Sequence, residues 1–170
     1  MKSNIRKLTL TALFITVAVV GSTFSFPVLG SKCSPVQHMV NVCAAVFLGP
    51  GYGVLAAFLA SLLRNLFGLG TLLAFPGSMC GALLAGLLYQ TLGKKLWAAY
   101  AGEVVGTGIV GGMLAYPVAA FVMGNKAAAL FTFVVPFLVS TCGGTVIAAV
   151  IVTALDKAGV LKRFQRELDR

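Results

Sequence analysis

Residues 34–53, SPVQHMVNVCAAVFLGPGYG, decide how the rest of the chain is interpreted. The run from Met39 to Leu48 is almost entirely apolar, yet it reaches a Gly-Pro-Gly sequence after far fewer than the roughly 20 residues that a helix needs to cross a bilayer. Three polar side chains, Gln37, His38 and Asn41, stand at its start. Short helices are tolerated in a membrane where protein or a water-filled site covers them. The stretch therefore predicts a short helix beside a binding cavity.

The composition of the whole chain is that of an integral membrane protein. Hydrophobic residues make up 59% of the 170 residues and charged residues only 10%, whereas a soluble domain has about 45–50% apolar and about 25% charged residues. A water-soluble fold of this composition would expose large apolar patches. The net charge is +9, but no basic run is interleaved with aromatic residues, so we expect no nucleic-acid partner. The chain also lacks a G-x-x-x-x-G-K-[ST] motif for ATP.

Turn residues and charges divide the chain into about six apolar segments. They predict an all-α bundle of about six transmembrane helices in a single membrane domain, residues 1–170. The basic start and the apolar run after it are also typical of a signal peptide, but this run is longer than usual, and we expect it to remain as the first helix. Pro136 is expected to kink the last helix, and the charged end of the chain to form a surface helix or a frayed end. The predicted helices are 8–26, 38–48, 54–67, 72–92, 96–123 and 127–155.

The distribution of Lys and Arg predicts the orientation of the chain. Six spans place both termini on one side of the membrane, together with Lys94 and Lys95. Ten of the 13 basic residues then share that side, and three, Lys32, Arg64 and Lys126, lie on the other. Because positively charged loops stay inside, both termini are predicted to be cytoplasmic, in a multi-pass protein of the plasma membrane. His38 is then predicted to lie near the outer face.

The outer end of the second predicted helix carries the best candidates for ligand contacts. We expect Ser34 as its N-cap and Pro35 at its first position. Gln37 and Asn41 are then four residues apart on one face, and His38 lies on an adjoining face. Three hydrogen-bonding side chains thus meet near one mouth of the membrane, which favours a site for a small polar molecule. The alternative for His38 is an interfacial or capping role.

The same stretch does not predict a metal site. Zinc is typically held by four ligands in tetrahedral geometry, and the chain has one histidine and four scattered cysteines that form no C-x-x-C motif. We therefore expect neither a metal nor a cofactor. A disulfide between Cys33 and Cys43 is a further alternative.

Polar side chains elsewhere in the predicted helices are also candidates, because such groups are costly in hydrocarbon. Glu103 is interpreted either as a substrate or proton site or as a helix–helix contact, to Thr107 or to a neighbouring helix. Arg64 ends the third helix, where it either extends to the interface or contacts an anion or acceptor at the mouth of the cavity. Further candidate contacts are Asn65 and Ser78, with Phe75 or Tyr116 stacking on a ring.

Residues 34–90 resemble the ThiW family, through the motifs PVQHMVN, GPGYG, RN and FPGS. That family belongs with the substrate-binding S components of energy-coupling factor transporters, and it is assigned to uptake of hydroxyethylthiazole, the thiazole precursor of thiamine. The resemblance implies a compact six-helix bundle that binds substrate near the outer face. It also implies docking on a transmembrane coupling subunit attached to two cytoplasmic ATPases. In S components, small residues on the first helix form the docking surface in an alanine-x-x-x-alanine pattern. The matching positions here are Ala12 and Thr16, and the second of them departs from alanine.

The ligand implied by the resemblance suits the residues. Hydroxyethylthiazole is a small, neutral heterocycle, and Gln37, His38 and Asn41 offer partners for its ring nitrogen and hydroxyl. The alternatives are an S component for another small vitamin or precursor, such as thiamine or hydroxymethylpyrimidine, and a stand-alone carrier that uses Glu103. An enzyme is not expected, because PGSMCG lacks the G-x-S-x-G-like setting of a serine nucleophile.

Overall fold

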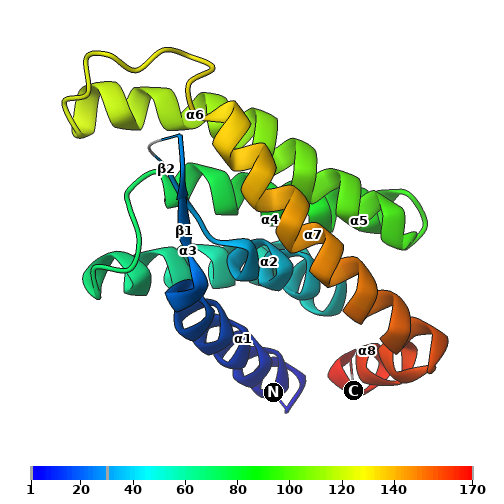
Figure 1. Ribbon diagram of the computed structural model, residues 1–170. Coiled ribbons are helices and arrows are strands. Elements are labelled where there is room, and N and C mark those ends of the chain that lie inside the picture. The colour runs from blue at the N-terminus through cyan, green and yellow to red at the C-terminus, as the bar shows by residue number, and fades with distance from the viewer. Residues whose placement is uncertain (1, 30, 170) are drawn as a thin grey trace.

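The computed structural model describes residues 2–29 and 31–169 and is a bundle of helices with one short hairpin (Figure 1). The chain begins with α1 (Lys2–Gly21) and one 3₁₀ turn, η1 (Ser22–Phe24). Strands β1 (Phe26–Val28) and β2 (Ser31–Cys33) then pair antiparallel. The prediction of helix as far as residue 26, followed by a plain loop, is therefore wrong at this point. Pro27 cannot continue a helix, and it is tolerated in an edge strand.

Three helices follow the hairpin along the chain: α2 (Pro35–Leu48), α3 (Pro50–Leu66) and α4 (Ala74–Thr91). Gly49 alone joins α2 to α3, and its φ of 86° lies in the left-handed region that favours glycine. The sequence predicted that the whole of GPGYG separates the two helices. That is wrong, because only Gly49 does so and the residues after it already belong to α3. Pro50 starts α3, because its fixed φ suits the first position of a helix and no N–H is needed there.

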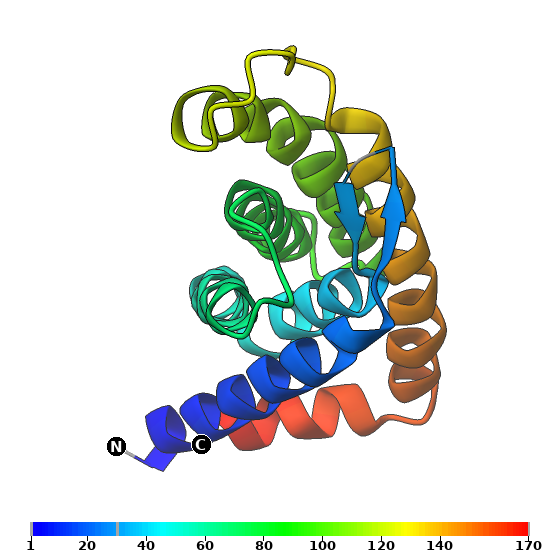
Figure 2. The ribbon, with the colours of Figure 1, turned by 60° about the vertical axis from the view of Figure 1, so that its left-hand side comes forward.

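The short helix α2 lies at the centre of the molecule (Figure 2). It packs against α1, α3, α4 and α7, and side chains such as Val40, Val42 and Ala44 are buried. A helix of 14 residues is therefore covered by protein rather than by lipid, which removes the requirement that it span a bilayer alone.

The predicted helix 96–123 is one long rod that contains two π-helical stretches. It runs through α5 (Leu96–Glu103), η2 (Val104–Gly111), α6 (Gly112–Pro117) and η3 (Val118–Val122), of which η2 and η3 are π-helical. Wide turns of this kind occur frequently at functional sites. Here the first of them begins directly after Glu103.

The last predicted helix, 127–155, begins later than expected. It is α7 (Val134–Lys157), because the residues before it form turns in which the side chains of Asn125 and Thr132 accept hydrogen bonds from backbone N–H groups. Pro136 lies in the first turn of α7, where a proline is tolerated, so the predicted kink is wrong. The chain ends in α8 (Val160–Asp169), the surface helix that was one of the two expectations for the charged end.

Three helical stretches among the described residues are long and apolar enough to cross a membrane: Asn4–Phe24, Leu96–Val122 and Val134–Lys157. The helices between the first and the second of these are shorter or less apolar, so six full-length spans are not shown. Both termini lie at the same end of the molecule (Figures 1 and 2). The assignment of that end to the cytoplasm stays a prediction.

The backbones of helices α4 and α5 lie in close contact at Gly102. A Cβ on Gly102 would lie 2.6 Å from the carbonyl oxygen of Leu84 and 2.7 Å from the Cα of Ala85. We expect Gly102→Ala to lower the free energy of unfolding by about 1–3 kcal/mol, as overpacking typically does. The change should appear as a lower melting temperature of the purified protein in detergent.

Gly51→Ala is the matched control for this prediction. A Cβ on Gly51 meets nothing within 4 Å, and alanine is the better helix former. Its melting temperature should equal or exceed that of the wild type. Equal stability of the Gly102 and Gly51 variants would contradict the close packing of α4 on α5.

Candidate binding site

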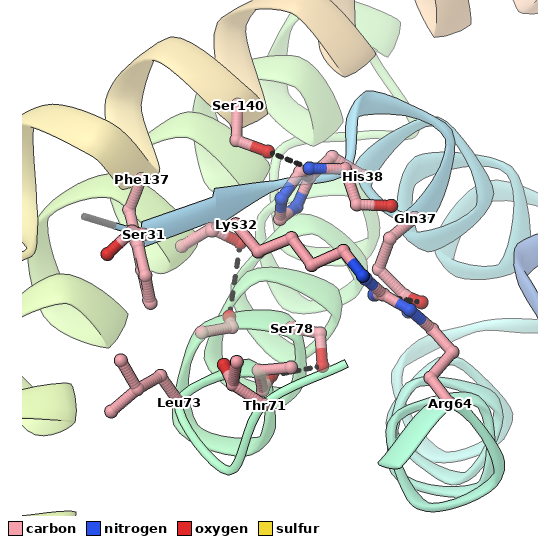
Figure 3. Close-up of a pocket in the computed structure, with 14 residues that line it drawn as sticks. Ser31, Lys32, Gln37, His38, Arg64, Thr71, Leu73, Ser78, Phe137 and Ser140 are labelled. Carbon is pink, nitrogen blue, oxygen red and sulfur yellow. Dashed lines mark hydrogen bonds between the residues drawn. The ribbon is translucent and has the colours of Figure 1, made fainter. Parts of the chain in front are cut away.

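A small cavity lies where the hairpin meets helices α2, α3, α4, η2 and α7 (Figure 3). The volume open to the centres of water molecules is about 40 Å³, which is room for roughly three ordered waters. Phe137 and Leu73 supply its larger apolar surfaces. The rest of the wall is largely polar, with six hydroxyl side chains: Ser31, Ser34, Thr71, Ser78, Thr107 and Ser140.

The start of α2 is fixed to α7 by polar contacts. The backbone N–H of Ser34 donates to Ser140 Oγ at 2.9 Å, and Cys33 Sγ donates to the carbonyl of Pro136 at 3.3 Å. Burial raises the pKa of the Cys33 thiol, which keeps the thiol protonated as a donor. Ser34 occupies the N-cap position and Pro35 the first helical position, as predicted, although the Ser34 side chain makes no capping hydrogen bond.

One oxygen of Glu103 is the polar centre of the site. His38 Nδ1 lies 2.9 Å from Glu103 Oε1, Asn41 Nδ2 lies 3.1 Å from it and Thr107 Oγ1 lies 2.9 Å from it. A carboxylate oxygen accepts hydrogen bonds, so this arrangement assigns the donating proton of the imidazole to Nδ1. His38 Nε2 has no hydrogen-bond partner among the described residues, and His38 lines the cavity. The ring therefore presents an acceptor to a ligand.

A chain of side-chain amides connects Glu103 to Arg64. Arg64 Nη1 donates to Gln37 Oε1 at 3.2 Å, Gln37 Nε2 donates to Asn41 Oδ1 at 3.2 Å, and Asn41 Nδ2 donates to Glu103. A cation at one end and an acid at the other thus fix the orientation of both amides, since a flip of either would bring donor against donor. The second N–H of Asn41 donates to the carbonyl of Ser78 at 3.2 Å. Both donors of this amide are therefore used within the protein.

A glycine on α4, Gly81, leaves room for the side chain of Glu103. A Cβ on Gly81 would contact Thr107 Oγ1 and would lie 2.6 Å from Glu103 Oε2. Glycine at this position lets the carboxyl group and the threonine hydroxyl lie directly against the backbone of α4. Glu103 is fully buried as a result, and Oε2 has no hydrogen-bond partner among the described residues.

The family of the chain follows from comparison with known proteins. The family described as thiamine-precursor transporter protein (ThiW) matches residues 8–158. The chain belongs to the ThiW family. Comparison with curated proteins and with solved structures found no match. The resemblance inferred from the motifs is thereby confirmed, and the protein is a membrane transporter of the thiamine-precursor family rather than an enzyme.

In this ThiW protein, four of the predicted contact residues line the cavity: Gln37, His38, Arg64 and Ser78. Asn41 and Glu103 lie directly behind them and hold them in place through the hydrogen bonds described above. Glu103 was interpreted either as a substrate or proton site or as a helix–helix contact. The structure contains the contacts of the second interpretation, to Thr107 and to a neighbouring helix. The same contacts place this acid beside the cavity rather than away from it.

Three other predicted contacts do not line the cavity. Asn65 Nδ2 donates to the carbonyls of Ser61 and Thr71 at 2.8 Å and 3.0 Å, so it holds the loop between α3 and α4. Phe75 packs on Phe58, with 5.7 Å between ring centroids, and Tyr116 is half-buried elsewhere on the rod.

Several lining residues from distant segments were not predicted from the sequence. Phe137 and Ser140 lie on α7, and Lys32 lies on the hairpin. Ser140 and Thr141 are adjacent polar residues within a long apolar helix, a signal that points to a functional position. For Phe137 the sequence held no such signal, since one phenylalanine among twelve in apolar helices is not distinctive.

The described residues contain no group of three or more His, Cys, Asp and Glu side chains that could hold a metal ion. Cys33 and Cys43 are both buried, free thiols. The alternative of a disulfide between them therefore does not hold.

Glu103 provides the second prediction, on stability. Glu103→Leu removes the shared acceptor and leaves buried donors of His38 and Asn41 unpaired, each at a cost of roughly 1–3 kcal/mol. Thr107 Oγ1 can still donate to the carbonyl of Gly77 at 3.1 Å. We expect a drop of about 2–4 kcal/mol in the free energy of unfolding, measured by thermal unfolding in detergent. Glu103→Gln keeps an acceptor oxygen and should retain most of the stability.

Glu167→Gln is the control, because Glu167 is half-exposed and pairs with the exposed Arg163 on α8. It should change stability by less than about 0.5 kcal/mol. A Glu103→Leu variant as stable as this control would show that the buried contacts do not support the fold.

Proposed function

We propose that this ThiW protein is the substrate-binding S component of an energy-coupling factor transporter and that it imports hydroxyethylthiazole. The observation that carries the proposal is a small cavity whose hydrogen-bonding groups are mostly uncharged, in a chain of the thiamine-precursor transporter family. Sites for small ligands combine a few convergent polar groups with an apolar wall. Hydroxyethylthiazole is larger than the roughly three waters for which this cavity has room, so the walls have to move apart when the ligand binds.

The groups around the cavity are complementary to this ligand. The ring of Phe137 supplies a flat apolar surface for the thiazole. Nε2 of His38 accepts from the ligand hydroxyl, and the N–H of Gln37 that is not used by Asn41 donates to the ring nitrogen. Ser78 supplies a further hydroxyl, although it already contacts Ser61 Oγ at 2.9 Å.

Docking on a coupling subunit is proposed for the surface of α1. Ala12 and Thr16 are both exposed and lie one turn apart. Thr16 Oγ1 donates to the carbonyl of Ala12 at 2.9 Å, so its hydroxyl is satisfied within the helix. The pair therefore presents a small, apolar strip that lets a partner helix approach closely. The partners are the transmembrane coupling subunit and its two cytoplasmic ATPases.

A third prediction concerns the ligand. His38→Ala removes the free imidazole acceptor and should weaken hydroxyethylthiazole binding about tenfold or more, the value of one good hydrogen bond in affinity. Calorimetric titration of the purified protein in lipid nanodiscs measures this. Gln90→Ala, at an exposed position outside the cavity, is the control with unchanged affinity.

Two results would count against this part of the proposal. Unchanged binding in both His38→Ala and Gln37→Ala would remove the cavity as the binding site. Binding of thiamine or hydroxymethylpyrimidine in place of hydroxyethylthiazole would leave an S component for another vitamin.

A fourth prediction separates binding from transport. Thr16→Trp should abolish uptake of radiolabelled hydroxyethylthiazole by cells that express the coupling subunit and both ATPases, because the bulky ring blocks close approach to α1. Binding by the purified variant should stay at the wild-type level. Val150→Trp, which adds the same ring at an exposed position on α7, should transport normally.

Cells without the ATPases test the remaining alternative. The proposed function requires that wild-type uptake be lost in them. Uptake that persists without ATPases would instead favour a stand-alone carrier, for which Glu103 is the candidate proton site.

A further inference from the structure

Arg64 holds more hydrogen-bond donors than the protein satisfies. Its side chain is 3% exposed and lines the cavity. A guanidinium has five N–H donors, yet the described residues supply one side-chain acceptor, Gln37 Oε1. Nε is buried without a partner, and no carboxylate of the described residues lies within 4.0 Å of the guanidinium. A buried guanidinium with unpaired N–H donors is costly in free energy unless a ligand supplies the missing acceptors.

Other unsatisfied groups lie around the same cavity. Ser31 Oγ and Ser34 Oγ are buried without hydrogen-bond partners among the described residues, and both line the cavity. Lys32, between them on β2, lines it as well, and its stem extends across the cavity in the view of Figure 3. Two cations and two free hydroxyls thus lie on the wall of one small compartment.

The charge of this compartment is not balanced by the protein. The nearest acid in the network, Glu103, is separated from Arg64 by the amides of Gln37 and Asn41. Two positive groups and one negative group leave an excess of one positive charge at the site. A single negative charge on the ligand would offset it.

We infer that the cavity has a subsite for an oxyanion, formed by Arg64 and Lys32, and that its preferred ligand is a small heterocycle that carries one carboxylate. The planar guanidinium matches a carboxylate with two parallel hydrogen bonds. The ring of the ligand lies against Phe137. The hydroxyl of hydroxyethylthiazole, which donates its proton to Nε2 of His38, offers this subsite only a neutral, weaker acceptor oxygen. The inference rests on the proposed function, since it takes the ThiW cavity to be the substrate site.

Two ligands that differ in one group test the inference. Hydroxyethylthiazole is compared with the thiazoleacetate in which CH₂–CH₂–OH is replaced by CH₂–COO⁻, by calorimetry on the full-length protein in nanodiscs at neutral pH. The wild type should bind the acid about tenfold more tightly or better, because hydrogen bonds to a charged acceptor are about twice as strong as neutral ones. Added salt should reduce this preference.

Charge-neutralising variants locate the subsite. Arg64→Gln should abolish the preference for the acid, and Lys32→Gln, at an exposed position, should reduce it without affecting folding. Lys126→Gln removes an exposed cation that does not line the cavity and should keep the full preference.

The possible failures are distinguishable. If hydroxyethylthiazole binds and the acid binds no more tightly, the inference is wrong and the proposed function stands. The same holds if the preference survives both Arg64→Gln and Lys32→Gln. If neither thiazole binds, the proposed function and the inference are both wrong.

Discussion

Glu103 Oε1 collects hydrogen bonds from α2 and from its own rod, and the arrangement of the site depends on this oxygen. A buried acid in a membrane protein is stable only with such partners. By holding His38 and Asn41, Glu103 fixes the rotation of α2 about its axis. That rotation then decides which side chains of α2 face the cavity: Gln37 and His38 line it, whereas Asn41 contacts only protein groups.

The burial of Glu103 also explains why α2 is short and why glycines lie where α4 meets η2. A polar centre inside an apolar bundle has to be covered by protein on every side, and α2 is short enough to lie wholly within it. The absence of a side chain at Gly81 brings the carboxyl group of Glu103 against α4. Close helix packing and the polar site are therefore one feature, and a substitution that separates α4 from η2 disturbs both.

Much of the site could be anticipated, because intramembrane polar residues are rare enough to be noticed singly. Gln37, His38, Arg64, Ser78 and Glu103 were all identified in this way. Their mutual contacts were not, since Gln37 and Glu103 are far apart in the chain and belong to different helices. The aromatic residue was misassigned for the same reason: Phe75, Tyr116 and Phe137 look alike in the sequence, and only the packing of α7 places Phe137 on the cavity wall.

The sequence by itself determined the membrane class, the family, and most helix boundaries, because composition, turn residues and local motifs act over short distances along the chain. It missed the hairpin of β1 and β2. It also misplaced the start of α7, because the side chains of Asn125 and Thr132 compete with helix formation before that helix. Only the tertiary structure decided which polar groups satisfy one another and which remain free for a ligand. That distinction depends on contacts of about 3 Å between segments distant in sequence, and no local pattern encodes them.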